Sequence, residues 1–375
     1  FDQYVQVVLI VRSLHGIAGG IMIPLSLSLL FDVYEKEVHG RVAGIWGIQL
    51  TVASIIGPTV GGLIIQFGQL QYLFWLNVPF AIVSLCLCAT QINSYQVMRK
   101  KEMDLFGIIY MVLSILLLSV SIQLFLKQVL PTWLLVMMLV GGLLLLIRFI
   151  QLENKKIEPL LNYKLLQRKT IFAITVLIAA IQDVVMLGAV FVLPLLFQEV
   201  YQLPSSAVGA MFIPTAIFTS LFMWLGGHWM DKGKSKNFIV VGIVIVAISI
   251  ISFSFFPKSV SIFVLILLMI GRGIGGGLSN MTVTTIGLHT LSQEELHEGS
   301  ALASTIERFS SSFAVMLLTI YYDFRWSMLI NAGLSVADAK WMAIKEECVI
   351  LGSIMLVTVP FVLYITRKRV DIGVH

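Results

Sequence analysis

Charged residues are scarce in this chain, and their scarcity excludes most soluble architectures. Asp, Glu, Lys and Arg make up 12% of the 375 residues, about half of the quarter that is usual in a soluble domain. Apolar residues make up 58%, against about 45–50% in such a domain. Too few polar side chains remain to cover such a chain in water. The surrounding solvent is therefore expected to be lipid, in which a spanning helix needs about 20 apolar residues.

Cysteines are few and catalytic motifs are lacking. The chain has 3 cysteines, Cys86, Cys88 and Cys348, and none of them forms a CxxC pair. The sequence therefore predicts neither a disulfide framework nor a metal site. The segment 233–235 reads Gly-Lys-Ser but lacks the earlier glycine that a phosphate loop requires. No nucleophile–base arrangement is found, so we expect no cofactor and no enzymatic activity.

Long hydrophobic runs dominate the chain instead. They predict an all-α polytopic membrane protein with about eleven transmembrane helices, each long enough to cross a bilayer. The runs lie at residues 4–30, 42–66, 72–91, 104–126, 131–150, 170–198, 205–230, 237–256, 260–288, 299–322 and 343–366.

Basic residues are divided unequally between alternate loops. One set of loops, together with the C-terminal tail, holds most of the lysines and arginines, as in residues 99–101 and 367–369. Such residues favour the cytoplasmic side, so we expect a multi-pass protein of the cell membrane with a cytoplasmic C-terminus. The net charge of +5 is then a topology signal and does not indicate nucleic acid. An odd number of spans would place Phe1 outside, which predicts upstream sequence with an odd number of helices.

Two parts of the chain resemble each other. Arg12 and Arg272 both begin the pattern R-x-x-x-G in an apolar run. Related halves in one membrane chain are typical of transporters built from structural repeats. The predicted organisation is a remnant of an N-terminal helical bundle at 1–92, an inserted helix pair with its linkers at 93–169, and a C-terminal bundle at 170–375.

The second run carries a regular set of small residues. Ala53, Gly57 and Gly61 are four residues apart, so they form one stripe on a helix along which a neighbouring helix can approach closely. A proline beside them removes a helical hydrogen bond and is expected to bend the segment. Ordinary helix packing explains any single glycine, whereas the whole pattern is more specific. The pattern consists of Gly44, Ala53, Gly57, Pro58, Gly61 and Gly62.

This pattern resembles the antiporter motif of the major facilitator superfamily. The segment 9–12 with Gly16 and Gly20 resembles the family's fourth-helix motif, and the resemblance links Arg12 to proton coupling. Residues 72–79, 153–161 and 193–198 resemble the fourteen-helix drug:proton antiporter branch, the EmrB/QacA-like exporters.

The resemblance implies a fold, a function and a set of partners. The fold would be the major facilitator fold, of which this chain holds family helices four to fourteen and lacks the first three. The function would be proton-coupled efflux (antiport) of hydrophobic or cationic drugs by alternating access, with protons, a small molecule and the lipid bilayer as partners. Lacking three helices, this chain alone is not expected to transport.

A second-half gating loop of the family is similar to a segment after the seventh run. The matching residues are Gly227, Asp231, Lys232 and Gly233, although the spacing between the aspartate and the second glycine is one residue short. The plainer interpretation is that Asp231 caps the start of a helix and that the lysines lie on the cytoplasmic side.

Charged residues inside apolar runs are the candidates for proton coupling. Each costs about 2.5–3.5 kcal/mol in hydrocarbon on insertion scales, so each must face protein or water. For Arg12, transport chemistry and a static pair between helices are equally open; for Arg272 the static pair is favoured. Glu307 and Arg308 are adjacent, so they point about 100° apart and are not expected to face one partner.

Asp183 is the acid that we favour as a proton carrier. It lies in the middle of an apolar run, where loss of hydration disfavours its ionised form. The alternative is a permanent ion pair with one of the arginines Arg12, Arg272 and Arg308. Two other functions stay open, namely a facilitator-type uptake symporter and a membrane fragment without transport activity.

Overall fold

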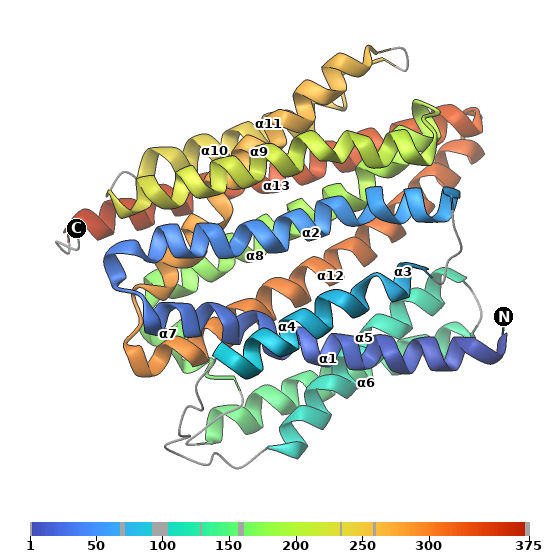
Figure 1. The fold of residues 1–375 in the computed structure, drawn as a ribbon. Helices are drawn as coiled ribbons and strands as arrows, with labels where there is room; N and C mark the ends of the chain where they lie inside the picture. The colour runs from blue at the N-terminus through green and yellow to red at the C-terminus, as the bar shows by residue number, and fades with distance from the viewer. Residues whose placement is uncertain are drawn as a thin grey trace.

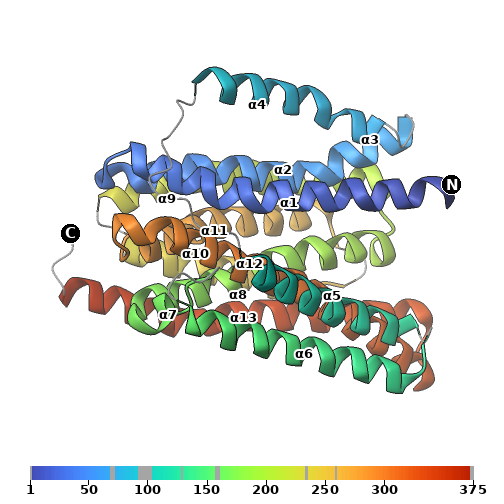
Figure 2. The same ribbon diagram turned by 90° about the horizontal axis from the view of Figure 1, so that it is seen from below.

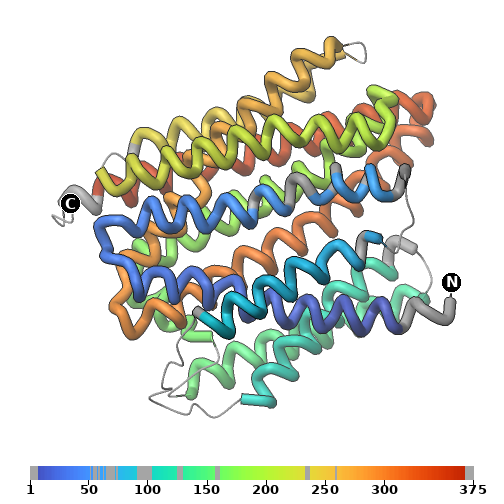
Figure 3. The backbone as a smooth tube through the Cα atoms, viewed as in Figure 1, coloured from blue at the N-terminus to red at the C-terminus, as the bar shows by residue number. Residues whose placement is uncertain are grey.

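Helices make up nearly the whole of the described chain (Figure 1). The computed structural model describes residues 2–67, 72–91, 104–127, 130–156, 161–232, 235–257 and 260–371, and uncertain positions are grey in Figure 3. No strand is found in these ranges. In chain order the elements are α1 (Asp2–Val33), the 3-10 helix η1 (Lys36–Val38), α2 (His39–Phe67), α3 (Tyr72–Trp75), α4 (Asn77–Gln91), α5 (Leu105–Lys127), α6 (Thr132–Lys155), α7 (Lys164–Arg168), α8 (Thr170–Leu195), the π-helix η2 (Leu196–Val200), α9 (Ser205–Asp231), α10 (Ser235–Ser252), α11 (Ile262–Leu288), α12 (Gln293–Asn331) and α13 (Val336–Asp371).

Every predicted hydrophobic run coincides with a helix, except that the run 72–91 is divided between α3 and α4. Among the residues that the structure describes, 8 helices are long and apolar enough to cross a membrane. Shorter apolar helices lie at Asn77–Thr90 and Asn237–Ser252. The predicted fold class, an all-α polytopic membrane protein, is therefore confirmed.

The last two helices are longer than predicted. The apolar runs 299–322 and 343–366 lie inside α12 and α13, which extend further at both ends. A capping box of Ser292 and Glu295 begins α12. Hydropathy locates only the lipid-facing part of a helix, whereas polar turns continue where caps and ion pairs stabilise them.

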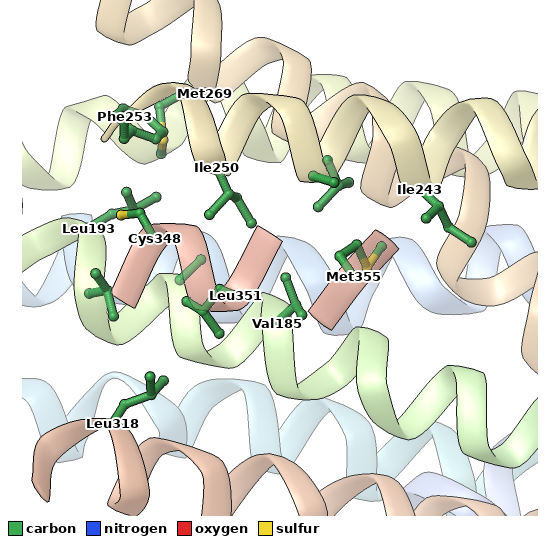
Figure 4. Close-up of a cluster of buried hydrophobic side chains, with 14 of the residues drawn as sticks. Val185, Leu193, Ile243, Ile250, Phe253, Met269, Leu318, Cys348, Leu351 and Met355 are labelled. Atoms are coloured by element: carbon green, nitrogen blue, oxygen red, sulfur yellow. The ribbon is translucent and has the colours of Figure 1, made fainter. Parts of the chain in front are cut away.

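The core lies among helices of the C-terminal part, with α8 packed against α11, α12 and α13. Figure 4 shows part of this core, in which Val185 of α8, Ile250 of α10 and Leu351 of α13 meet. Helix α11 lies between α9 and α10. A Cβ added at Gly273 would be 2.7 Å from the Thr215 carbonyl of α9, so the two backbones nearly touch.

The N-terminal helices are less enclosed. Helix α2 packs along α9, and the second half of α1 contributes Leu27 and Phe31 to a second buried cluster. By contrast, residues 7–18 of α1 and 77–90 of α4 are exposed. Figure 2 shows α4 at the edge of the bundle, away from α8 and α12.

The helices α5 and α6 pack against each other, and α5 also contacts α12. Lys156, just after α6, forms ion pairs with Asp104 before α5 and with Glu153 of α6. The hydrogen bond from Lys156 lowers the pKa of Asp104 below its usual value. This ion-pair cluster holds one end of the predicted helix pair together.

Candidate functional site

A cavity of about 140 Å³ lies between two groups of helices. One wall comes from α1 and α2, and the other comes from α8, α9, α11 and α12. The cavity therefore lies where the N-terminal helices meet the C-terminal bundle, a common place for ligand sites between helices.

Helical periodicity explains which side chains line the cavity. Along α11 the lining residues Arg272, Gly276, Asn280 and Thr284 are four residues apart, which places them on one face. The lining residues of α9 repeat in the same way. Each helix thus presents one narrow stripe to the cavity.

An acidic cluster lies at the wall formed by α8 and α12. Asp183 of α8 and both Glu307 and Arg308 of α12 line the cavity. The Asp183 Oδ2 atom lies 3.5 Å from Arg308 Nη1. This is longer than the ~2.7–2.9 Å of a strong charge-assisted hydrogen bond. We call Asp183, Glu307 and Arg308 the acidic cluster.

Glu307 lies close enough to Asp183 for their charges to interact. Glu307 also forms a hydrogen bond with Thr284 of α11. Its Oε1 atom is buried and has no hydrogen-bond partner in the part of the chain that the structure describes. Arg308 pairs with Asp183, whereas the like charge of Asp183 repels Glu307, so in the described chain the two adjacent residues have different partners although both line the cavity.

Arg272 lies on a different part of the wall. It is 2% exposed, and its Nη2 atom donates a hydrogen bond of 3.0 Å to the Met186 carbonyl. Its Nε and Nη1 atoms have no hydrogen-bond partner among the described residues. The static carboxylate pair favoured from the sequence is therefore not found in that part of the chain.

Arg12, the remaining proton-coupling candidate, does not line the cavity. It lies in the exposed first half of α1. The structure thus brings Asp183, Glu307 and Arg308 together and leaves Arg12 outside this group.

The close approach predicted for α2 occurs at an unexpected place. A Cβ at Gly57 would have nothing within 4 Å among the described residues, and Ala53 is exposed. At Gly44, by contrast, a Cβ would be 2.7 Å from the Met223 carbonyl of α9. Among the described residues, α9 approaches the face of α2 that carries Gly40 and Gly44, and a helix contact along the stripe through Gly57 stays a prediction. The side chains of Pro58 and Gly62 lie outside the described part, and Gly61 is half-buried.

Asp231 links the end of α9 to the start of α2. Its Oδ1 accepts a hydrogen bond of 2.9 Å from the Gly40 amide, and its Oδ2 accepts one of 3.1 Å from the Arg41 amide. A carboxylate at these amides caps α2 and suits the positive end of its dipole. The interpretation of Asp231 as a helix cap is thus confirmed, although the helix belongs to the other group.

Glycines make this crossing possible. A Cβ at Gly40 would be 2.6 Å from the Gly227 carbonyl, so only small residues fit on both helices. Lys232 is exposed beside the crossing, and Gly233 lies outside the described residues. We call the contact of Gly40, Arg41, Gly227 and Asp231 the α2–α9 seam.

Sequence reasoning missed several polar lining residues, chiefly Asn280, Thr284 and Ser304. A signal for them was present, because Asn280 and Thr284 continue the four-residue spacing that begins at Arg272. The described residues contain no group of three or more side chains that could hold a metal ion.

Comparison with known proteins assigns the chain to a family. The family model of the Major Facilitator Superfamily matches residues 1–315. Multidrug transporter protein MdtP of Bacillus subtilis (strain 168) is 25% identical over 325 residues, which cover 86% of this chain and 60% of that protein. Multidrug export protein EmrB of Haemophilus influenzae (strain ATCC 51907 / DSM 11121 / KW20 / Rd) is 23% identical, with 84% of this chain and 62% of that protein covered.

Lincomycin resistance protein LmrB of Listeria monocytogenes serovar 1/2a (strain ATCC BAA-679 / EGD-e) is 23% identical, with 80% of this chain and 64% of that protein covered. The chain spans less than two thirds of the length of these relatives. Because the family match extends over most of the chain, the chain belongs to the Major Facilitator Superfamily, whose members are membrane transporters and not enzymes.

Proposed function

We propose that this protein exports small hydrophobic or cationic compounds across the cell membrane in exchange for protons. The observation that carries the proposal is the acidic cluster at the wall of the cavity, where two carboxylates meet one guanidinium. The similarity to proteins named as multidrug transporters and exporters supports the substrate class.

Charge balance supplies the coupling mechanism. With all three groups ionised, the acidic cluster carries one net negative charge at the cavity wall, where Asp183 is mostly buried and Arg308 is half-exposed. A proton on Asp183 or Glu307 would neutralise it, and so would the positive group of a bound compound. Because each neutralises the same charge, proton and substrate would compete, and uptake of one would favour release of the other.

Alternating access requires that the two helix groups separate at one end while they close at the other. The α2–α9 seam is a contact that such a movement would break, because it joins Gly40 and Arg41 of one group to Asp231 of the other. We assign the seam to the cytoplasmic side from the distribution of basic residues. The gating loop would then consist of Gly227, Asp231 and Lys232. The present structure would correspond to the state in which the seam is closed.

Measurement of ethidium export tests the proposal, with the protein in inverted membrane vesicles. Asp183→Asn should leave the protein folded but abolish transport driven by a pH gradient, because the amide cannot take up a proton. The matched control is Asp323→Asn, which changes an exposed carboxylate of α12 outside the cavity. This control should transport normally.

The same experiment distinguishes the carrier from a structural ion pair. If Asp183 only pairs with Arg308, then Asp183→Asn should reduce the amount of folded protein, and the added change Arg308→Gln should partly restore it. Normal proton-driven export by well-expressed Asp183→Asn protein would contradict the proposed role of Asp183.

A further inference from the structure

The exchange of a proton for a cation gives no role to Arg272, although Arg272 lines the same cavity. Its side chain is among the largest fully buried ones in the described chain. One guanidinium nitrogen donates to the Met186 carbonyl, and the other two have no hydrogen-bond partner among the described residues. A guanidinium stays charged at any physiological pH, so it cannot avoid the energetic cost of burial by losing a proton.

Packing of α11 does not require this arginine. The close contacts of α11 come from its glycines, since a Cβ at Gly273 or Gly277 would collide with carbonyl groups of α9. A buried charge without a partner costs several kcal/mol, whereas an apolar side chain of similar volume would fill the space without that cost. The retained charge at a cavity wall therefore favours a partner that is bound from the cavity.

The nearby carboxylates are not that partner. Asp183 lies beside Arg308, and Glu307 has Thr284 as its hydrogen-bond partner. Thr284 and Arg272 belong to one stripe of α11 and are separated by about 18 Å along the helix axis. Apolar side chains, including Met186, Val190 and Leu50, line the cavity together with these polar groups. Arg272 reaches the Met186 carbonyl, which lies one helical turn after Asp183 on α8, whereas Glu307 lies beside Thr284. The cavity thus presents a basic group at Arg272 and the acidic groups Asp183 and Glu307, with apolar side chains around them.

We propose that Arg272 binds the carboxylate of an amphoteric substrate, whose amine lies at the acidic cluster. The assignment of the amine end rests on the function proposed above. The assignment of the carboxylate end rests on Arg272 itself. The substrate class is small apolar molecules that carry one basic and one acidic group.

The chemistry of the basic and acidic groups explains why such a molecule is preferred. A carboxylate accepts hydrogen bonds from the free guanidinium nitrogens and supplies the missing negative charge. A compound with only a cationic group satisfies the acidic cluster but leaves two buried guanidinium nitrogens of Arg272 without a hydrogen-bond partner among the described residues. Amphoteric compounds should therefore bind more tightly than their esters, which keep the cation but lose the acid.

Two dyes that differ only at this group provide the test. Rhodamine B carries a free carboxylate and a delocalised cation, and its ethyl ester keeps the cation but loses the acid. Fluorescence titration of the purified protein in lipid nanodiscs measures binding without any proton gradient. We expect rhodamine B to bind about tenfold more tightly than the ester, which corresponds to one charged hydrogen-bonded contact.

Arg272→Gln should remove this preference by weakening rhodamine B about tenfold while the ester still binds as before. Arg272→Lys keeps the charge and should retain part of the preference, which separates binding from a merely structural role. Unchanged ester binding shows that each variant is folded. If Arg272→Gln does not fold, the Arg272→Lys variant and the unmodified protein still decide the question.

Equal affinity of the unmodified protein for both dyes would overturn the proposal, and so would an unchanged preference in folded Arg272→Gln protein. The outcome is independent of proton coupling. A preference that depends on Arg272 but occurs without pH-driven export would sustain this inference while the function proposed above fails. Proton-driven export of ethidium by a protein that binds both dyes equally would support the proposed function and contradict this inference.

Discussion

The pattern R-x-x-x-G occurs in both α1 and α11, but the structure places the two copies in opposite environments. In α11, Arg272 is buried, a Cβ at Gly276 would collide with the Met186 side chain of α8, and the adjacent Gly277 lies against the backbone of α9. In α1, Arg12 is exposed, and a Cβ at Gly16 would have nothing within 4 Å among the described residues. The same residues at the same spacing thus form a packed wall in one helix and an open face in the other.

The difference teaches that a stripe of small residues permits a close helix contact but does not create one. The helices α2, α8, α9, α10 and α12 all contact α11, so each of its faces has a partner. The described part of the chain encloses α1 only along its second half, where Leu27 and Phe31 are buried. Substitutions that add volume should therefore have unequal effects on these two helices.

The largest effect is expected from Gly277→Leu. A Cβ at this position would be 2.5 Å from the Thr219 carbonyl and 2.8 Å from the Met223 amide nitrogen, and backbone atoms cannot move aside as a flexible side chain can. The free energy of unfolding of this variant should fall by more than about 3 kcal/mol, which is the upper range for overpacking. The yield of monodisperse protein in mild detergent and its melting temperature measure this loss.

Gly16→Leu is the matched control for that substitution. It makes the same replacement of glycine by leucine, but the new side chain enters open space. Replacing a glycine inside a helix also stabilises the helix by up to about 1 kcal/mol. Its melting temperature should therefore be unchanged or slightly higher. A loss of folded protein equal to that of Gly277→Leu would show that α1 is as tightly enclosed as α11.

The comparison also shows how far the sequence determines the fold. Lipid requires long apolar helices joined by short polar loops, so hydropathy locates nearly every helix correctly. It misses the polar extensions of α12 and α13, because caps and ion pairs such as Arg325–Glu346 stabilise them instead of burial. It also misses the break between α3 and α4, because hydropathy ignores the helix-start signal of Asn77 followed by Pro79 in the first turn of α4.

Part of the candidate site could also be predicted from the sequence, because hydropathy reveals charges inside apolar runs. Asp183, Glu307 and Arg308 stand out because charges inside apolar runs must find partners, and the structure brings them together. The α2–α9 seam was not predictable in detail. The sequence offers two small faces on α2, one with Gly40 and Gly44 and one with Gly57, and only the position of α9 decides which is used.

A smaller effect on folding, but a clear one on transport, is expected from Gly57→Leu. The open space at Gly57 means that the melting temperature should not fall. The antiporter motif predicts that export is nevertheless impaired, because another access state would bring a helix against this face. A bias of about 1 kcal/mol between the two states already changes their ratio about fivefold. Ethidium export in vesicles measures this, and normal export would mean that Gly57 faces lipid in both states.

The smallest effect on binding is expected from Arg12→Gln, the counterpart of Arg272→Gln. Arg12 lies about 16 Å along α1 from Ile23, which lines the cavity. Arg12 is also absent from the residues that line the cavity. Rhodamine B and its ethyl ester should therefore bind to Arg12→Gln protein within about twofold of the unmodified protein, because neither dye contact is lost.

Export adds a second measurement to the same variant. The family motif links Arg12 to proton coupling, so Arg12→Gln should lower pH-driven ethidium export while both dyes still bind. Loss of binding in parallel with transport would place Arg12 at the substrate and would remove the contrast with Arg272. Unchanged binding and unchanged export together would instead show that Arg12 has only a structural role in α1. Proton coupling would then depend on the acidic cluster.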